Sequence, residues 1–498
     1  MIQVASTTPR GPFNGKAVTV VGLGRFGGGL GVTGWLCSQG ARVTVSDKAP
    51  ADSLADSVRA LKGLDVTLHL GEHLEEDFLQ ADLLIVNPAV RKDMPLLAKA
   101  LRAGVPYTTE INLFLERCRG TVVGVTGSVG KSTTTAMIGA ILSRSMKTHV
   151  GGNIGGSLLE ALPRIRKGDA VVLELSSFQL DDLPLIGISP HVAVVTNLTD
   201  NHTDWHGGMK GYIAAKKNIF RFQKPGDVLV LNADDRAVRR WAKEAPGRVE
   251  FFRGDVRGEG VPPLRVAGVP PARIAGILPA RGEGILPSRP EGVSPSVASS
   301  VSSSSSSGVP FQLSLPGAHN QVNAQAAWAA AREMGATRAQ ATKALAAFSG
   351  LPHRLQFVAE RGGVKYYNDS KCTTPEGAIV AMEGIAAGRA VIIVGGKDKG
   401  ADFDELGAVL AARAKAVIAL GETRDQILYA VRAHRKGKTP PLASVEDLPS
   451  AVALARRLAA SGDAVLLSPA CASTDMFTNY EERGNRFVKL VTGKGSRS

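Results

Sequence analysis

The chain has 498 residues, of which 44% are hydrophobic and 21% are charged. This length exceeds an ordinary single core, so we expect two to four domains of about 100–200 residues each. No apolar run reaches the roughly 20 residues that a membrane-spanning helix needs, and the first residues lack the apolar segment of a secretory signal. We therefore expect a cytoplasmic protein without membrane insertion.

The formal net charge is +14, but the basic residues are scattered along the chain. Without a stripe of basic and aromatic residues we expect no nucleic-acid partner, and the charge is either a solvated surface or a field that attracts anionic substrates. The four cysteines are far apart and form no C-x-x-C pair, which indicates reduced thiols and argues against a zinc site.

Residues 17–21, 41–47 and 81–90 contain short apolar strands that alternate with helical stretches, which predicts a parallel, doubly wound sheet. The turn after the first strand, GLGRFG, contains Gly22, Gly24 and Gly27, and Asp47 follows 20 residues after the last of these. This spacing fits a dinucleotide-binding turn, in which the backbone approaches a diphosphate at a helix N-terminus. A glycine turn with no ligand fits the same spacing, and a UDP group would use the same physics as NAD.

A strand, a glycine loop and a helix follow one another in TVVGVTGSVGKSTTTAMIGAIL. Backbone N–H groups of GSVGKST would cradle the phosphates of ATP, Lys131 would reach the outer phosphates and the Ser132 hydroxyl would bind Mg²⁺. The loop is not a strict Walker A motif, because Val125 stands where that motif has its first glycine.

Two further strands end in polar residues on the side where ligands bind open α/β sheets. Glu174 ends one of them, in LELSSFQ, and His202 follows the next, in TNLTDNHTDW. Either residue by itself is more often a surface or core group than a ligand, but the shared edge favours a second Mg²⁺.

The composition changes from about residue 253 to residue 310, where Gly, Pro, Ala, Arg and then Ser dominate. Such a segment buries too little apolar surface to offset its ordering entropy, so we expect a disordered surface insertion. An alanine-rich helix follows it, which places the insertion late in a central domain of residues 111–349.

A third α/β unit, residues 350–498, is predicted from the strands in AVIIVGG, AKAVIALG and DAVLLSPA, which read as parallel. Polar loops follow its strands in YYNDSKCTTPEG, GGKDKGADF and LSPACASTDMFTNYEERG. Loops in these positions usually hold ligands, although the same residues also make ordinary turns and helix caps.

Taken together, these strings resemble the Mur ligase family. GSVGKST is similar to that family's phosphate loop, with Ser128 where Thr is common, and GGNIG, ELSSFQ, TNLTDNH, YIAAKKNIF, PGAHNQVN, LPHR and NDSKCT also match. NPAV, residues 87–90, departs from the more usual S-P-G-[IV]. GGKDKGADF and SPACASTDMFTNYEERG resemble the members that add D-glutamate.

The resemblance implies an α/β fold of three domains: a Rossmann-like domain that binds UDP at residues 1–110, a central P-loop ATP-binding domain with a parallel sheet, and a C-terminal Rossmann-like domain that binds D-glutamate. It implies ATP-dependent ligation of D-glutamate to UDP-N-acetylmuramoyl-L-alanine by a monomer, with two Mg²⁺ ions.

The implied site residues fall into four groups. ATP would be bound by Gly127, Ser128, Gly130, Lys131, Ser132, Thr133, Asn323, Arg354 and Asp369. The two other substrates would be bound by Gly22, Gly24, Asp47, Asn153, Ser176, Thr373, Lys399, Ser473 and Tyr480. The catalytic residues would be Lys131, Glu174, His202 and Lys216. Metal ions would be bound by Ser132, Glu174, His202 and Lys216, the last as a carbamate.

Three other interpretations remain open at this point. A different amide ligase of the same architecture, such as another Mur ligase or folylpolyglutamate synthase, differs in the third-domain loops. A P-loop ATPase with an accessory Rossmann domain would hydrolyse ATP without a UDP-sugar. The interpretation as an NAD-dependent oxidoreductase is based on GLGRFG alone and does not explain the second glycine loop.

Overall fold

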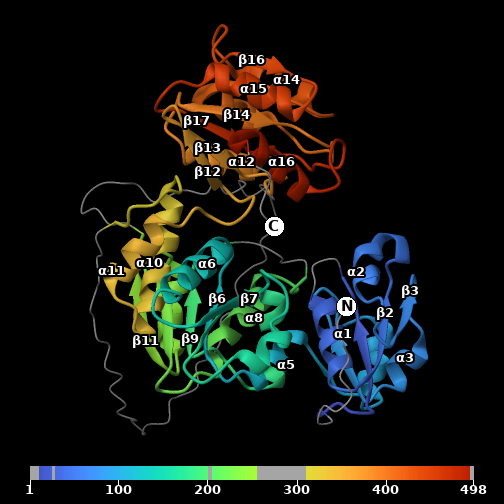
Figure 1. Cartoon of the computed structure of the whole chain (residues 1–498). Helices are drawn as coiled ribbons and strands as arrows, with labels where there is room; N and C mark the ends of the chain where they lie inside the picture. The colour runs from blue at the N-terminus through green and yellow to red at the C-terminus, as the bar shows by residue number, and fades with distance from the viewer. Residues whose placement is uncertain (1–10, 25–27, 200–204, 255–309, 494–498) are drawn as a thin grey trace, which may run out of the picture.

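The computed structural model describes residues 11–24, 28–199, 205–254 and 310–493. Three sheets follow one another along the chain, and the domain of the third lies above the central domain while that of the first lies beside it (Figure 1). The expected three-domain α/β fold is confirmed. Among the described residues, none of the helices has the length and apolar character needed to cross a membrane.

The first sheet is parallel and has the order β3-β2-β1-β4-β5. The three predicted strands are present: the first has the predicted bounds, and the other two are shorter than predicted. The strands are β1 (Ala17–Val21), β2 (Arg42–Asp47), β3 (Val66–Leu70), β4 (Leu83–Val86) and β5 (Tyr107–Thr108). The α-helices of this part are α1 (Gly28–Ser38), α2 (Ala55–Ala60), α3 (Glu75–Leu79) and α4 (Pro95–Arg102), with a 3₁₀ turn at Ala51–Leu54.

The central sheet is also parallel, in the order β11-β10-β9-β6-β8-β7. Its strands β8, β9 and β10 are buried along their whole length, because helices cover both faces. The strands are β6 (Thr121–Thr126), β7 (Thr148–Gly152), β8 (Ala170–Glu174), β9 (Val192–Val195), β10 (Val228–Asn232) and β11 (Arg248–Phe252).

The helices around this sheet include the predicted alanine-rich helix, α10, which packs on α6. They are α5 (Glu110–Arg117), α6 (Lys131–Leu142), α7 (Ser177–Leu180), α8 (Met209–Arg221), α9 (Arg236–Arg239), α10 (Ala318–Glu333) and α11 (Arg338–Ala346), with 3₁₀ turns at Leu159–Arg164, Leu183–Leu185 and Arg240–Glu244. The expected disordered insertion lies almost wholly at residues 255–309, outside the described residues.

The third sheet has the order β12-β13-β17-β14-β15-β16. It contains the three predicted strands but is not entirely parallel, since β12 pairs with β13 in the antiparallel direction across a short turn. The strands are β12 (Gln356–Arg361), β13 (Val364–Asn368), β14 (Ala390–Val394), β15 (Ala414–Ala419), β16 (Leu442–Ser444) and β17 (Ala464–Leu467). The helices are α12 (Pro375–Glu383), α13 (Asp404–Arg413), α14 (Arg424–His434), α15 (Leu448–Leu458) and α16 (Tyr480–Thr492).

The first and central sheets share one buried apolar cluster, which runs from Val20 and Trp35 through Ile111 and Phe114 to Val171. The third sheet has clusters of its own on its two faces. Burial of a common apolar surface ties the first two domains together more closely than either is tied to the third.

Candidate functional site

The glycine loop between β6 and α6 has a backbone that only glycine tolerates. Gly127 and Gly130 have φ angles of +147° and +83°, and a Cβ atom on either would collide with the side chain of Thr196 or Asn323. The loop opens α6 at Lys131, so its backbone N–H groups lie at a helix N-terminus, where phosphate groups bind favourably.

The segment after β9 shapes this loop. The Asn197 side-chain oxygen accepts hydrogen bonds from the backbone N–H groups of Ser128 and Val129 at 3.2 and 2.9 Å, and Thr196 Oγ1 donates to Val129 O at 2.7 Å. The Ser128 hydroxyl donates to Thr199 O at 3.0 Å and lies 3.1 Å from the Tyr212 hydroxyl. The Ser128 side chain therefore supports the loop from within.

Two lysines converge on one carbonyl oxygen of the loop. Lys131 Nζ donates to Gly127 O at 3.0 Å and to Ser128 O at 2.9 Å, and Lys216 Nζ donates to Gly127 O at 2.8 Å. Burial, together with the charge of Lys131, lowers the pKa of Lys216 to about 7. Burial lowers the pKa of Lys131 as well, although the nearby carboxylate of Glu174 acts in the opposite direction.

The neighbouring Lys217 points away from the loop. It is paired with Glu244 at 2.6 Å, whereas Lys216 is only 1% exposed. The two lysines project from different faces of α8, as adjacent residues of a helix must. The fold thus brings Lys216, and not Lys217, to the loop.

Glu174 is buried at the end of β8, where it was predicted to lie. Its Oε1 accepts a hydrogen bond from Asn153 Nδ2 at 2.8 Å, and its Oε2 has no hydrogen-bond partner among the described residues. Because a buried carboxylate oxygen without a donor is costly, this atom fits a cation ligand.

The rest of the expected metal set is only partly described. His202 lies outside the described residues. Ser132 is buried in the first turn of α6, and Thr133 beside it is partly exposed. In the described part of the chain, no group of three or more His, Cys, Asp or Glu side chains is placed to hold a metal ion.

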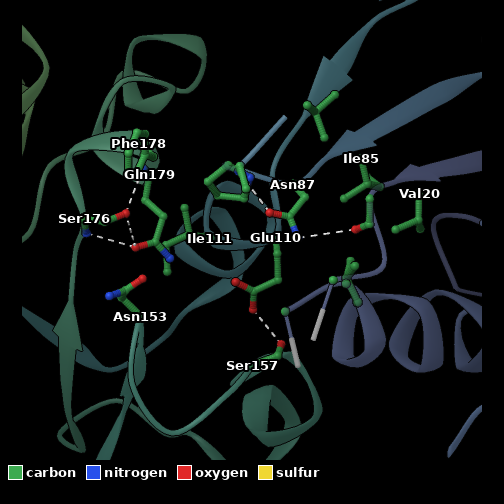
Figure 2. Close-up of a pocket in the computed structure, with 18 of the residues that line it drawn as sticks. Val20, Ile85, Asn87, Glu110, Ile111, Asn153, Ser157, Ser176, Phe178 and Gln179 are labelled. Atoms are coloured by element: carbon green, nitrogen blue, oxygen red, sulfur yellow. Dashed lines mark hydrogen bonds between the residues drawn. The ribbon is translucent and has the colours of Figure 1, made fainter. Parts of the chain in front are cut away.

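A pocket of about 350 Å³ lies between the first and central domains (Figure 2). It brings together four residues that the sequence assigned to substrate binding: Gly22, Gly24, Asn153 and Ser176. Asn153 also donates to Glu174, whose charge acts on Lys131, so this side of the pocket lies near the phosphate loop.

Asp47 does not line this pocket. Its carboxylate accepts hydrogen bonds from the backbone N–H groups of Leu23 at 2.8 Å, Gly24 at 3.2 Å and Ala49 at 2.8 Å. With its oxygens used in this way, Asp47 holds the shape of the glycine turn.

Two polar residues of the pocket, Asn87 and Glu110, had not been predicted to bind substrate. Asn87, which stands where the family pattern has Ser, donates through its side chain to Gly22 O at 3.3 Å. Glu110 accepts a hydrogen bond from Ser157 Oγ at 2.5 Å, and burial raises the pKa of its carboxyl group, although part of the side chain faces the pocket. Neither residue belongs to a strong local motif.

The expected adenosine contacts lie near the phosphate loop and on the third domain. Asn323 of α10 packs on Gly130, and Arg354 is an exposed residue whose positive charge lowers the pKa of Lys131. Asp369 is buried, which raises the pKa of its carboxyl group to about 6, and its oxygens accept from Leu355 N at 3.0 Å and Ser468 Oγ at 2.8 Å.

The four residues expected to bind D-glutamate come from three loops of the third domain. Thr373 and Lys399 are exposed, and Ser473 is buried. Tyr480 begins α16, and its ring lies 5.5 Å from the ammonium group of Lys371.

A residue that had not been predicted from the sequence, Arg483, holds two of these loops together. Arg483 of α16 is 2% exposed and donates to Ser370 Oγ at 3.0 Å, Ser370 O at 2.9 Å, Cys471 O at 3.1 Å and Ala472 O at 3.3 Å. Burial lowers the pKa of its guanidinium group to about 10, which still leaves it charged at neutral pH. Only its place in the string NYEERG could have indicated this role.

The fold and site define an enzyme with a phosphate loop in the central one of three α/β domains. Three family models match the chain: "Mur ligase MurD-like, N-terminal domain" at residues 16–109, "Mur ligase middle domain" at 125–255 and "Mur ligase, glutamate ligase domain" at 353–471. Since the chain is also 41% identical to a relative over 96% of its length, it belongs to the Mur ligase family.

Two relatives are both named UDP-N-acetylmuramoylalanine–D-glutamate ligase. The protein of Symbiobacterium thermophilum is 41% identical over 479 residues, 96% of this chain and 98% of that protein. The protein of Roseiflexus sp. is 38% identical over 480 residues, again 96% and 98% of the two chains. The fold is also that of the UDP-N-acetylmuramate-alanine ligase MurC of Thermotoga maritima, with a TM-score of 0.54, 18% identity, and coverage of 96% of this chain and 99% of that one.

Proposed function

We propose that this protein ligates D-glutamate to UDP-N-acetylmuramoyl-L-alanine at the expense of ATP, in the synthesis of peptidoglycan precursors. The observation that carries the proposal is the position of Asn153, which lines the interdomain pocket and also bonds to Glu174. A nucleotide-linked substrate in that pocket would present its free carboxylate beside the phosphate loop. Full-length similarity to D-glutamate ligases supports the choice of amino acid.

The reaction begins with phosphoryl transfer, because a carboxylate is a poor electrophile. An oxygen of the L-alanyl carboxylate attacks the γ-phosphorus, the bond to the β-phosphate oxygen breaks, and ADP leaves. This transfer needs alignment and charge neutralisation above all. Lys131 and the backbone N–H groups of residues 127–133 supply positive charge to the phosphates.

In the second step the neutral amine of D-glutamate attacks the carbonyl carbon of the acyl phosphate. A C–N bond forms, the C–O bond to the phosphate breaks, and inorganic phosphate leaves while the amine loses a proton to solvent. Water would hydrolyse the same acyl phosphate, so the third domain must cover the site during this step.

Two Mg²⁺ ions would be held by Ser132, Glu174, His202 and Lys216 in its carbamate form, and would supply further neutralisation of phosphate charge. The unpartnered Oε2 of Glu174 supports this ligand set. Carbamylation joins the neutral Lys216 amine to CO₂ with loss of one proton, and a pKa of about 7 makes that amine available near neutral pH.

The remaining residues are assigned to the three substrates. Gly22 and Gly24 bind the UDP diphosphate with Asp47 fixing their turn, Ser176 contacts the muramoyl group, and Asn323, Arg354 and Asp369 surround the adenosine. D-Glutamate is received by Thr373, Lys399, Ser473 and Tyr480, with the ammonium of Lys399 offsetting its carboxylates.

We also propose domain boundaries at residues 1–110, 111–349 and 350–498. The protein acts as a monomer in the cytoplasm, where UDP-linked precursors are made.

The test is release of phosphate from ATP in the presence of UDP-N-acetylmuramoyl-L-alanine and a panel of amino acids. We expect release that requires both the nucleotide substrate and D-glutamate. Release with a different amino acid would keep the ligase class and overturn the subfamily. Release without either substrate would favour a plain ATPase.

A further inference from the structure

The two walls of the interdomain pocket belong to different domains. One wall contains the glycine turn and the segment 87–89 after β4, and the other contains residues 152–153 together with Ser176, Phe178 and Gln179 (Figure 2). The width of the pocket therefore depends on the contacts that hold these two segments at a fixed separation.

A polar cluster centred on the buried Asp182 joins the segment that follows the first wall to the segment that follows the second. Asp182, shortly after α7, accepts hydrogen bonds at Oδ1 from Lys92 Nζ at 2.6 Å and from the Tyr107 hydroxyl at 2.9 Å. Its backbone oxygen accepts from Asn112 Nδ2 at 2.8 Å, and Lys92 also pairs with Asp181 at 2.9 Å. The Asp182 side chain is only 3% exposed.

The chain itself links this cluster to the first wall. Lys92 follows a turn in which Asn87 accepts bonds from the backbone N–H groups of Ala89 at 3.0 Å and Val90 at 2.8 Å. The same Asn87 donates to Gly22 O in the glycine turn. A shift of Lys92 would therefore reach the segment that faces the ligand.

The cluster also reaches the second wall. The backbone N–H group of Asp182 donates to Gln179 O at 3.4 Å, and the Gln179 side-chain oxygen accepts from Ser176 N at 3.0 Å. Gln179 and Ser176 both line the pocket. The ion pair between Lys92 and Asp182 thus joins a segment that continues into the first wall to a segment that is bonded to the second.

The buried Asp182 carboxylate needs the positive charge of Lys92 beside it. A buried carboxylate is stable only when paired, so removal of Lys92 would leave Asp182 inside the protein with a phenol as its remaining side-chain donor. Burial and the nearby Asp182 carboxylate raise the pKa of Tyr107 to about 12, which keeps that phenol protonated. The phenol can donate a hydrogen bond but cannot neutralise the carboxylate.

We infer that Lys92, acting through Asp182, is a positioning residue for the nucleotide-linked substrate, because it fixes the separation of the two pocket walls. This inference rests on the proposed function, which places that substrate in the pocket. It assigns the residue to substrate affinity and not to the chemical step.

The test compares Lys92→Met with the wild type by calorimetric titration of UDP-N-acetylmuramoyl-L-alanine and, separately, of ATP. We expect the Kd for the UDP substrate to rise about tenfold with the Kd for ATP unchanged, as expected when a coupled contact is lost. KM for the UDP substrate should rise in parallel while kcat at saturation is retained.

Three further variants sharpen the comparison. Tyr107→Phe, which removes one hydroxyl and leaves the charges, should give a smaller rise in Kd, and it provides a second reading if Lys92→Met folds poorly. Lys92→Arg should restore binding. Lys99→Met removes the exposed 2.8 Å pair with Glu75 on the same domain and should leave both affinities unchanged.

The outcomes separate the two proposals. A wild type that does not bind the UDP substrate would overturn the proposed function. Normal wild-type binding with an unchanged Kd in Lys92→Met, even with a lower melting temperature, would show a purely structural contact and overturn the inference alone. An equal rise in the Kd for ATP and for the UDP substrate in Lys92→Met would also overturn the inference, because it would mean general damage to the central domain.

Discussion

The carbonyl oxygen of Gly127 in the phosphate loop accepts hydrogen bonds from the side chains of both Lys131 and Lys216. Two ammonium groups so close together repel each other, and burial adds to the penalty. A ligand with negative charge would relieve this repulsion. The loop is therefore poised to exchange an internal contact for a phosphate group.

Lys131 is the residue on which phosphoryl transfer should depend most. Lys131→Ala should lower kcat for ligation by a factor of about 10² or more, because a preorganised charge at the transferring phosphate is lost. Phosphate release with all substrates present measures this, and circular dichroism should show an intact fold. Lys217→Ala is the matched control, since Lys217 faces Glu244 and not the loop. Turnover near the wild-type level would contradict the role.

Lys216 should also influence stability as a function of pH. Burial lowers its pKa from the ordinary 10.5 to about 7, so between these values the unfolded chain binds the proton that the folded chain has released. The free energy of unfolding should therefore rise with pH over this range, by up to about 1 kcal/mol per pH unit.

The measurement is denaturant unfolding between pH 7 and 9 in CO₂-free buffer. Lys216→Met has no proton to release, so the wild type should gain stability relative to this variant as the pH rises. Lys217→Met should follow the wild-type curve. Parallel curves for the wild type and Lys216→Met would contradict the buried, neutral amine.

At the scale of elements, the loops at the carboxyl ends of strands are fixed by segments far away in sequence. Thr196 and Asn197 after β9 hold the loop before α6, and Asn323 of α10 packs against its last glycine. In the third domain α16 has the same task, because Arg483 joins the loops after β13 and β17.

Arg483→Lys should therefore raise KM for D-glutamate by about tenfold or more. Lysine cannot reproduce the planar fork of donors that bonds to three residues at once, so the loops with Thr373 and Ser473 lose their common support. Initial-rate kinetics would measure the change, with KM for UDP-N-acetylmuramoyl-L-alanine as an internal control that should not move. An unchanged KM for D-glutamate would exclude this role for α16.

At the scale of the whole molecule, the third domain presents positive charge to the central domain. Burial lowers the pKa of both Lys131 and Lys371; the charge of Arg354 adds to the lowering at Lys131, and the charge of Glu174 opposes it at Lys371, so charges act between the two domains. The first two domains share a core, whereas the third has separate ones. Movement between domains should therefore occur mainly at the third.

Arg354→Ala tests this electrostatic contribution. We expect KM for ATP to rise several-fold at low salt and the difference from the wild type to shrink at high salt, because salt screens charges that are exposed. Kinetics at two ionic strengths would show both effects. Lys365→Ala, which removes an exposed cation from β13, should behave as the wild type. Equal salt dependence in Arg354→Ala and the wild type would refute the contribution.

Much of this protein follows from its sequence alone. The strands around Val20, Val123 and Ile392 are apolar runs of the length that a buried parallel strand needs, and the glycines at 127 and 130 permit the one loop that links such a strand to a phosphate-binding helix. These features are local, so a pattern in neighbouring residues is sufficient to determine them.

The tertiary structure alone decided which side chains point toward the phosphate loop and which bond elsewhere. It turned Lys216 toward the loop and Lys217 away, directed Asp47 into its own turn, and joined Lys92 to Asp182 across the domain junction. Each of these outcomes depends on atoms that are distant along the chain and meet only after the sheets have packed. Local periodicity carries no information on such pairs, which is why the sequence predicted the loops correctly but not the contacts that hold them in place.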